Sequence, residues 1–390
     1  MSSADLHSDA QRLAPTLRSW RRHLHAHPEL SGEERQTAAF VAKELRAIGL
    51  EPRICADGRG VLAELPAPGG GPWVALRADT DALPIREETG LSYASTQPGV
   101  MHACGHDAHT AMLLGAARLL HERRDALTRS VRFLFQPHEE RYPGGAPALI
   151  AEGALDGVES IFGIHISSTL PIGDLGTRPG PFMAAVNPLR ARIIGRGGHA
   201  AMPDQTVDPV VAAAHAITAL QTVVSRNVPI TEPVVVSVTQ LQAGSADNVI
   251  PNEVSFSGTI RTFQEKWRGA VCRRVEEVIV GVARAHQAEA RVEIDPGYPV
   301  LCNDARQTDR ALQAARAVGF ADNHLVELPP IGGGEDFAYY CERVPGVFVF
   351  LGAANPAKGC VHPHHHPRFD VDEDALPHGA ALHAQFAMLA

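Results

Sequence analysis

Apolar runs of five or six residues, without regular polar alternation, recur along the first half of the chain. They predict strands at 61–65, 74–78, 131–136 and 161–166. Helices are predicted between them, after Thr110 and around 146–152. Strands that are apolar throughout are typical of a sheet covered by helices on both faces, so this part of the chain is predicted to form an α/β domain.

A further helix is predicted before the first of these strands. Apolar residues between 41 and 48 recur on one helical face, and Gly49 is suited to end the helix. Ser31, followed three residues later by Glu34, has the pattern of a capping box, in which the two side chains bind backbone amides at the start of a helix.

The pattern changes between residues 190 and 294. Strands are predicted at RARIIG, VVVSVTQLQ, EVSFSGTIRTF and ARVEI, and helices at 210–224 and 271–286. The order strand, helix, strand, strand, helix, strand is that of a split βαβ, ferredoxin-like unit. The α/β pattern then resumes with a helix near 305–318, the strand GVFVFLG and a closing helix. We therefore expect a mixed-sheet α/β domain, residues 1–186 and 296–390, interrupted by an α+β domain at 187–295.

Composition and charge narrow the class of function. The 390 residues, 45% hydrophobic and 20% charged, are typical of a globular protein large enough for two domains. The net charge of -9 argues against nucleic acid or an anionic membrane as partner. The N-terminal sequence lacks the pattern of a secretory signal, and no run approaches the roughly 18 apolar residues of a membrane span, so the cytoplasm is expected. The six cysteines are scattered, which disfavours a disulfide framework.

Residues suited to metal binding or proton transfer collect in four short segments. They are Cys104, His106, Asp107 and His109 in CGHDAH; Glu139 and Glu140 in FQPHEE; His165 in IFGIHI; and His362, His364, His365 and His366 in CVHPHHHPRFDVDE. Each segment alone has an ordinary explanation, such as a core histidine or a solvated loop. Together they supply the about five ligands of a binuclear metal site and a spare glutamate to move the proton of a bound water. The combination predicts a metallohydrolase.

The chain also resembles the M20 metallopeptidase superfamily in nine segments that occur in the same order. These are RADTDALP, MHACGHDAHTAMLLGAA, FQPHEE, GIHI, GRGGHAAMP, TVDPV, AGSADNVIPNEVSFSGTIRTF, GGGEDF and HHPRFDVDEDALPHGAALHA. The greatest similarity is to the amidohydrolase branch, which includes hippurate hydrolases, N-acyl-L-amino-acid amidohydrolases and indole-acetyl-amino-acid hydrolases.

The resemblance implies two divalent metal ions, five ligands and one general base. The implied ligands are Cys104, His106, Glu140, His165 and His365, and the implied base is Glu139. His365 follows from the family pattern His-x-Pro-x-Phe-x-x-Asp-Glu, whereas spacing alone does not exclude His364 or His366. A set of thiolate, imidazole and carboxylate ligands suits Zn, Mn, Co or Ni.

The inserted domain is implied to be a dimerisation or lid domain, so a homodimer or higher homo-oligomer is expected. By resemblance, His199 would reach the active site of the partner subunit and hold the scissile carbonyl oxygen. Asn248 and Arg261 would contact the carbonyl or carboxylate of the substrate. Two aspartates each have two possible roles. Asp107 would orient a metal ligand or cap a helix, and Asp81 would lie behind the metal site or shape a turn.

The expected function is hydrolysis of the amide bond of N-acyl amino acids, which gives a carboxylic acid and a free amino acid. The alternatives are a dipeptidase or carboxypeptidase of the same superfamily, and a non-catalytic metal- or ligand-binding protein. The presence of Glu139 disfavours the last of these. His138 departs from the branch, which has a small residue before the glutamate pair, and the acyl group is not implied.

Overall fold

The structure is a computed structural model that describes residues 3–389. Its contacts divide the chain into two compact units. The first unit holds the chain up to Gly180, Cys302–Pro329 and the chain from Asp336 onward; the second holds Pro181–Leu301 and Pro330–Glu335. The sequence placed the insertion at 187–295, so these divisions lie six residues outside that range at each end, and a short later segment joins the second unit.

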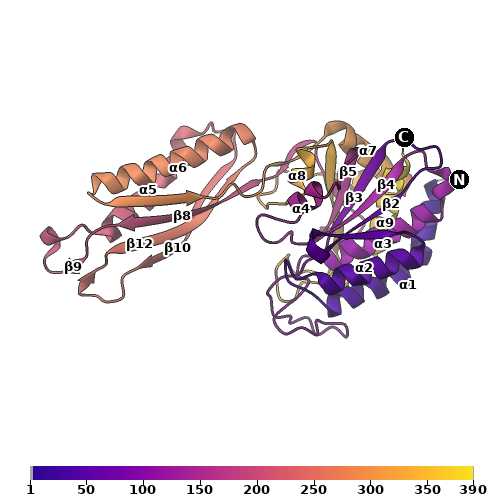
Figure 1. Ribbon diagram of the computed structural model, residues 1–390, viewed down its shortest axis with the longest axis horizontal. Coiled ribbons are helices and arrows are strands. Elements are labelled where there is room, and N and C mark those ends of the chain that lie inside the picture. Colours follow the sequence, from indigo (N-terminus) through magenta and orange to yellow (C-terminus); the bar gives the residue numbers. More distant parts are fainter. Residues whose placement is uncertain (1–2, 390) are drawn as a thin grey trace. The chain divides into compact units, whose positions relative to one another are not determined.

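The first unit is built on an eight-stranded sheet with the order β1-β2-β4-β3-β5-β16-β6-β15 (Figure 1). Its strands are β1 (Pro52–Cys55), β2 (Gly60–Leu65), β3 (Trp73–Asp79), β4 (Ser130–Gln136), β5 (Val158–Pro171), β6 (Leu175–Thr177), β15 (Leu325–Glu327) and β16 (Gly346–Ala354). The four central strands β4, β3, β5 and β16 are parallel, whereas β2 and β6 are antiparallel to their central neighbours. The predicted mixed sheet is confirmed.

Helices cover both faces of this sheet. They are α1 (Ser3–Ala26), α2 (Arg35–Ile48), α3 (His106–His121), α4 (Ala146–Ala151), α7 (Ala305–Ala317), α8 (Ala338–Cys341) and α9 (Ala375–Met388). Phe162 of β5 stacks on Phe386 of α9, while the Cα of the next residue, Gly163, faces Phe337 just before α8. Because successive residues of a strand face opposite sides, α9 and α8 lie on opposite faces.

In this unit the sequence analysis missed one helix and made one wrong local prediction. The helix α1 was not predicted, although its buried Leu13, Leu17 and Leu24 follow helical spacing. The capping box is wrong: α2 begins at Arg35 and neither Ser31 nor Glu34 caps it; the Glu29 carboxylate instead accepts from the amides of Gln36 at 3.2 Å and Thr37 at 2.8 Å. Gly49 does end α2, in the left-handed conformation with φ 103°.

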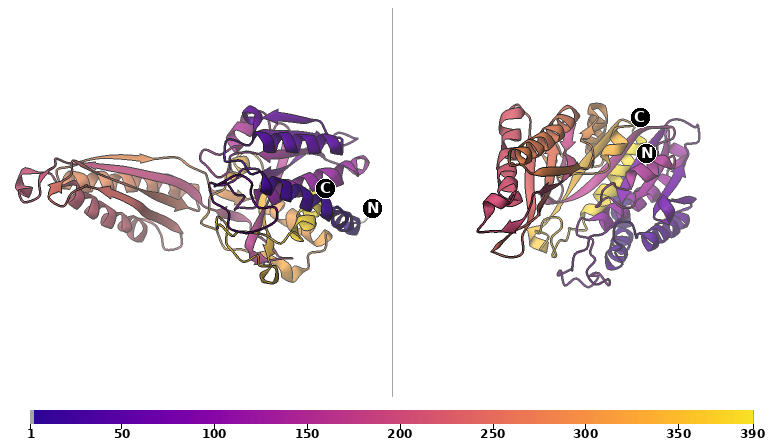
Figure 2. Two further views of the ribbon diagram at one scale, coloured as in Figure 1. Left: turned by 90° about the horizontal axis from the view of Figure 1, so that it is seen from below. Right: turned by 60° about the vertical axis from the view of Figure 1, so that its left-hand side comes forward.

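The second unit is a four-stranded antiparallel sheet with the order β10-β12-β8-β13. Its elements are β8 (Ala185–Ile194), α5 (Pro209–Asn227), β10 (Val234–Ala243), β12 (Glu253–Thr262), α6 (Glu265–Ala285) and β13 (Glu289–Ile294). The helices α5 and α6 lie side by side over one sheet face (Figures 1 and 2). Leu189 and Ile193 are buried on that face, and Arg190 and Arg192 point away from it. This is the predicted ferredoxin-like order.

Four short strands lie outside the eight-stranded and four-stranded sheets. In the second unit, β9 (Gly198–His199) pairs with β11 (Val249–Ile250). The strands β7 (Gly180–Met183) and β14 (Leu301–Asn303) each span a division between the units. All six cysteines are free thiols. Among the described helices, none combines the length and apolar character needed to cross a membrane.

Candidate metal centre

The site residues predicted in the first unit meet where parallel strands end. β3 ends at Asp79, and Asp81 follows two residues later; β4 ends at Gln136, and the two glutamates follow it. His165 lies within the neighbouring strand β5. The carboxyl ends of parallel strands share one sheet edge, which is where open α/β sheets place their ligands.

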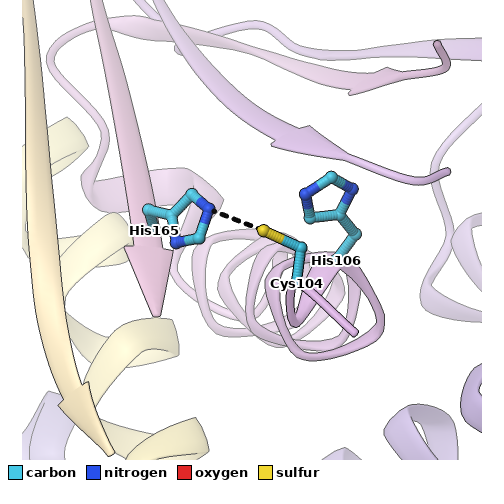
Figure 3. A group of neighbouring side chains, drawn as sticks. All are labelled: Cys104, His106 and His165. Carbon is cyan, nitrogen blue, oxygen red and sulfur yellow. Dashed lines mark hydrogen bonds between the residues drawn. The ribbon is translucent and has the colours of Figure 1, made fainter. Parts of the chain in front are cut away.

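Gly105 allows the chain to present Cys104 and His106 on either side of a tight turn. Its φ is 87°, and a Cβ at this position would lie 2.4 Å from Cγ2 of Ile166. A side chain here would clash as well as strain the backbone, so the position requires glycine. The turn directs the sulfur of Cys104 to 3.5 Å from Nε2 of His165, as Figure 3 shows.

Two groups of donor atoms share the sulfur of Cys104. One contains Cys104, His106 and His165, and the other contains Cys104, Glu140 and His365, with the atoms of each group within 4.8 Å of one another. Glu139 belongs to a third group, with His106 and Glu140. The structure therefore brings all five predicted ligands and the predicted base into one neighbourhood.

The two buried histidines offer their Nε2 lone pairs. Nδ1 of His165 lies 2.6 Å from the carbonyl oxygen of Ile166, to which it must donate. Nδ1 of His106 lies 3.2 Å from Oδ1 of Asp81 and donates to this carboxylate. Because the Nδ1 atoms carry the protons, both Nε2 atoms are free to bind a cation, the arrangement usual for metal-binding histidines.

Unsatisfied buried atoms test whether a metal fits here. Nε2 of His106 and Oε1 of Glu140 are both buried and make no hydrogen bond. They lie 3.8 Å apart, and Oε1 of Glu140 is 3.3 Å from Nε2 of His365. Buried polar atoms are rarely left without a partner. A divalent cation between them would satisfy both atoms, so the donor set fits a metal.

The electrostatics of the site also favour a cation. Burial and the carboxylates of Glu140 and Glu139 raise the pKa of the Cys104 thiol well above its usual value. Burial lowers the pKa of His106, but Asp79 and Asp81 overcome this and raise it to about 10. The carboxylates beside Cys104 and His106 favour positive charge at these two residues, and a metal cation can replace the protons held there.

His109 is excluded as a ligand by its own hydrogen bonds. Its Nδ1 lies 2.6 Å from Oδ1 of Asp79, and its Nε2 accepts from the amide of Ile166 at 2.8 Å. With both ring nitrogens engaged, the nearby group of Asp79, His106 and His109 is not a further metal site. Asp79, which the sequence analysis missed, also accepts from Arg77 at 2.7 Å. Its sequence signals were its position at the end of a strand and its place in the RADTDALP segment, neither of which gave it a role.

Of Asp81 and Asp107, for which the sequence left two roles open, Asp81 takes the role behind the metal site. Asp81 accepts from His106, from the hydroxyl of Ser31 at 2.6 Å and from the amide of Glu140 at 2.9 Å, so it lies behind the donor set.

Asp107 lies in the first turn of α3, as the helix-start interpretation expected, but its hydrogen bonds are made elsewhere. It accepts from Arg21 at 3.0 Å and His25 at 2.8 Å, and it makes no hydrogen bond to a predicted ligand or to a helix amide. Long-range partners of this kind leave no local sequence signal.

Within the histidine cluster, His365 is the residue that reaches Glu140. It adopts a left-handed conformation with φ 65°, and its amide donates to the carbonyl of Ala103 at 2.8 Å. His364 instead places Nδ1 at 3.7 Å from the sulfur of Cys104, a contact the sequence did not predict. His362 and His366 stack on each other, 4.4 Å between ring centroids.

The remaining predicted residues belong to the second unit. His199 in β9 pairs with β11, and the amide of Ala200 donates to the carbonyl of Asn248 at 3.1 Å, so these two predicted residues are neighbours. Arg261 in β12 is half-buried, and its Nε donates to Oγ1 of Thr259 at 3.0 Å. Burial lowers the pKa of Arg261. Among the described residues it has no carboxylate partner within 4.0 Å.

Comparison with known proteins gives concordant results. The profile of peptidase family M20/M25/M40 matches residues 75–389. An N-acetyl-L-cysteine deacetylase of Bacillus subtilis is 44% identical over 91% of this chain and 83% of its own. Thermostable carboxypeptidase 1 of Saccharolobus solfataricus is 36% identical over 98% of this chain and 97% of its own. The crystal structure of a dinuclear metal-binding M20 peptidase from Bacillus subtilis superposes with a TM-score of 0.85, at 38% identity, over 97% of this chain and 98% of that one.

Proposed function

Because the chain belongs to peptidase family M20/M25/M40 and is a metal-dependent amidohydrolase, we propose that it cleaves the amide bond of N-acyl amino acids. The products are a carboxylic acid and a free amino acid. The observation that carries the proposal is the convergence of five donor residues beside a second, adjacent glutamate.

Two divalent ions would be held by the two donor groups that share the sulfur of Cys104. His106 and His165 complete one group, and Glu140 and His365 complete the other. Bound ions of this kind polarise a carbonyl and lower the pKa of water to about 7. The ligand chemistry is compatible with Zn, Mn, Co or Ni.

Glu139 is assigned as the general base and acid. It is only 7% exposed, and its carboxylate lies in one group with Glu140 and His106. In this position it would take a proton from the attacking water and return it to the leaving nitrogen. Glu140, whose Oε1 makes no hydrogen bond, is the better of the two for metal binding.

The second unit would contribute to substrate recognition. His199 is proposed to hold the scissile carbonyl oxygen in the active site of the partner subunit, and Asn248 to bind the substrate beside it. Arg261, half-buried and without a described carboxylate partner within 4.0 Å, is suited to the α-carboxylate of an amino acid.

A homodimer is proposed through the same unit. Val235 and Leu241 are 45% and 56% exposed on the edge strand β10. Exposed apolar side chains along an unpaired strand edge favour association with a second copy.

A carboxypeptidase is the second candidate, because two relatives carry that name. Both reactions release an amino acid with a free carboxylate, and they differ only in the acyl side. The metal-reconstituted enzyme should be assayed with N-acetyl and N-benzoyl amino acids and with dipeptides that release the same amino acid. We expect higher kcat/KM for the N-acyl amino acids and no turnover after chelation. Faster dipeptide cleavage would favour the second candidate, and no turnover of either class would contradict both.

A further inference from the structure

Ser31 and Glu34, which do not cap α2, lie in a turn that binds the segment carrying the two glutamates. The Glu34 side chain is fully buried, at 0% exposure. Its Oε1 accepts from the amide of Gly32 at 2.9 Å and from the amide of His138 at 2.8 Å. His138 immediately precedes Glu139, so Glu34 is one peptide away from the assigned base.

His138 has a backbone conformation that needs support. Its φ is 63°, in the left-handed region that costs a non-glycine residue free energy and persists only where the surroundings enforce it. Gly32 makes room for the His138 ring, since a Cβ on Gly32 would lie 3.2 Å from Nδ1 of His138. The same turn therefore accommodates the His138 side chain and binds its amide.

The turn also holds the amide on the other side of Glu139. Ser31 donates to Oδ2 of Asp81 at 2.6 Å, and the same oxygen accepts from the amide of Glu140 at 2.9 Å. Glu139 is thus fixed through both of its chain neighbours. Glu34 reaches one of them directly, and Ser31 reaches the other through Asp81.

The burial of Glu34 is costly, which argues for a purpose beyond packing. Its Oε2 is buried without a hydrogen bond. Burial and the charge of Asp81 raise the pKa of Glu34 to about 7. A buried carboxyl group with one unsatisfied oxygen destabilises a fold unless its other interactions compensate. Here the compensating interaction is the hydrogen bond from the His138 amide, next to the assigned base Glu139.

We propose that Glu34 is a positioning residue for Glu139, acting through the amide of His138 to hold the base in its working geometry. The proposal rests on the assignment of Glu139 as the general base. A displacement of about 1 Å in a catalytic group can lower turnover about 10²-fold. Metal binding should be affected much less, because the amide of Glu140 is held by Asp81.

The test compares Glu34→Ala and Glu34→Gln with Glu33→Ala, an exposed neighbour whose side chain makes no described hydrogen bond. Gln keeps the oxygen that accepts from His138. We expect kcat of the metal-loaded Glu34→Ala enzyme to fall about 10²-fold with KM and metal content near wild type. Glu34→Gln should retain kcat within about threefold, and Glu33→Ala should match wild type.

Amide hydrogen exchange in the metal-free proteins gives a readout independent of activity. Peptides covering residues 138–142 should exchange faster in Glu34→Ala than in wild type, and should keep their protection in Glu34→Gln. If Glu34→Ala does not fold, a Glu34→Gln enzyme that loses turnover about 10²-fold would overturn the proposal. Wild-type kcat and exchange in Glu34→Ala would also overturn it.

Failure of the proposed function would be recognised separately. If Glu139→Gln keeps full turnover, the assignment of the base is wrong, whatever the Glu34 variants do. If Glu139→Gln is inactive while Glu34→Ala is unaffected, only the positioning role of Glu34 is wrong.

Discussion

Replacing Asp81 by asparagine should weaken metal binding by about 10- to 100-fold, the usual cost of losing the partner that orients a metal ligand. Three donors converge on the two oxygens of Asp81: His106 at 3.2 Å, the Ser31 hydroxyl at 2.6 Å and the Glu140 amide at 2.9 Å. An asparagine side chain has only one accepting oxygen, so either orientation of its amide fails one of the predicted ligands.

If the NH₂ group of the introduced asparagine faced Glu140, it would meet the backbone N–H of Glu140. Two donors would then oppose each other, and the Glu140 amide would lose its hydrogen-bond acceptor. That loss costs about 1–3 kcal/mol, or roughly five- to 150-fold in an equilibrium constant. If the NH₂ group faced His106, the ring would have to accept at Nδ1 and carry its proton on Nε2, the atom offered to the metal. Both outcomes lower metal affinity.

The affinity should be measured by competition with a chromophoric chelator, for each ion in turn. Asp57→Asn is a matched control, because the Asp57 side chain is 78% exposed and its described ion pairs are with Arg35 and Arg59, outside the donor set. The control should bind metal like wild type. Wild-type affinity in Asp81→Asn, with the same fold by circular dichroism, would refute the assignment of Asp81 as the residue that orients His106 and Glu140.

Three further variants test other parts of the site. Burial lowers the pKa of His25, but hydrogen bonds with Asp107 and Glu87 raise it from 6.5 to about 9. The protonated His25 therefore stabilises the fold fully below pH 6.5, and this contribution is lost as pH rises through 9. The free energy of unfolding in urea should therefore fall by on the order of 3 kcal/mol more in wild type than in His25→Gln over that interval, and equal slopes would contradict the network. His109→Gln should lower stability by about 1–3 kcal/mol yet keep two ions per chain; loss of an ion would show that His109 is a ligand. Metal loading should release about one proton fewer from Cys104→Ser than from wild type, measured with a pH indicator, whereas equal release would argue against a thiolate ligand.

Much of the fold was predictable because its elements carry strong local patterns. The split βαβ order of the second unit followed from alternating strands such as β12 and from helices of full length. The apolar runs of β3 and β4 likewise predicted a covered sheet. The extent of β5 was not predictable, since pairing with neighbouring strands lengthens it beyond its apolar run to Val158–Pro171.

The neighbourhood of the predicted metal ligands could be predicted from the sequence, but the hydrogen-bond network behind it could not. Cys104 and His106 flank a glycine within one motif, and the family pattern selected His365 among neighbouring histidines. By contrast, the contacts of Arg21 with Asp107 and of Glu34 with His138 join residues 86 and 104 positions apart. The capping-box prediction failed for the same reason, because Ser31 and Glu34 find long-range partners that outweigh the local ones.

The most direct test of the account is the paired measurement of metal content and turnover in Glu139→Gln. Glutamine preserves the shape of the side chain but cannot take a proton from water. The account predicts two ions per chain, as in wild type, with turnover of N-acyl amino acids lowered by about 10²–10⁴-fold. A variant that loses an ion would show that Glu139 is a ligand, and one that keeps its turnover would show that the base lies elsewhere.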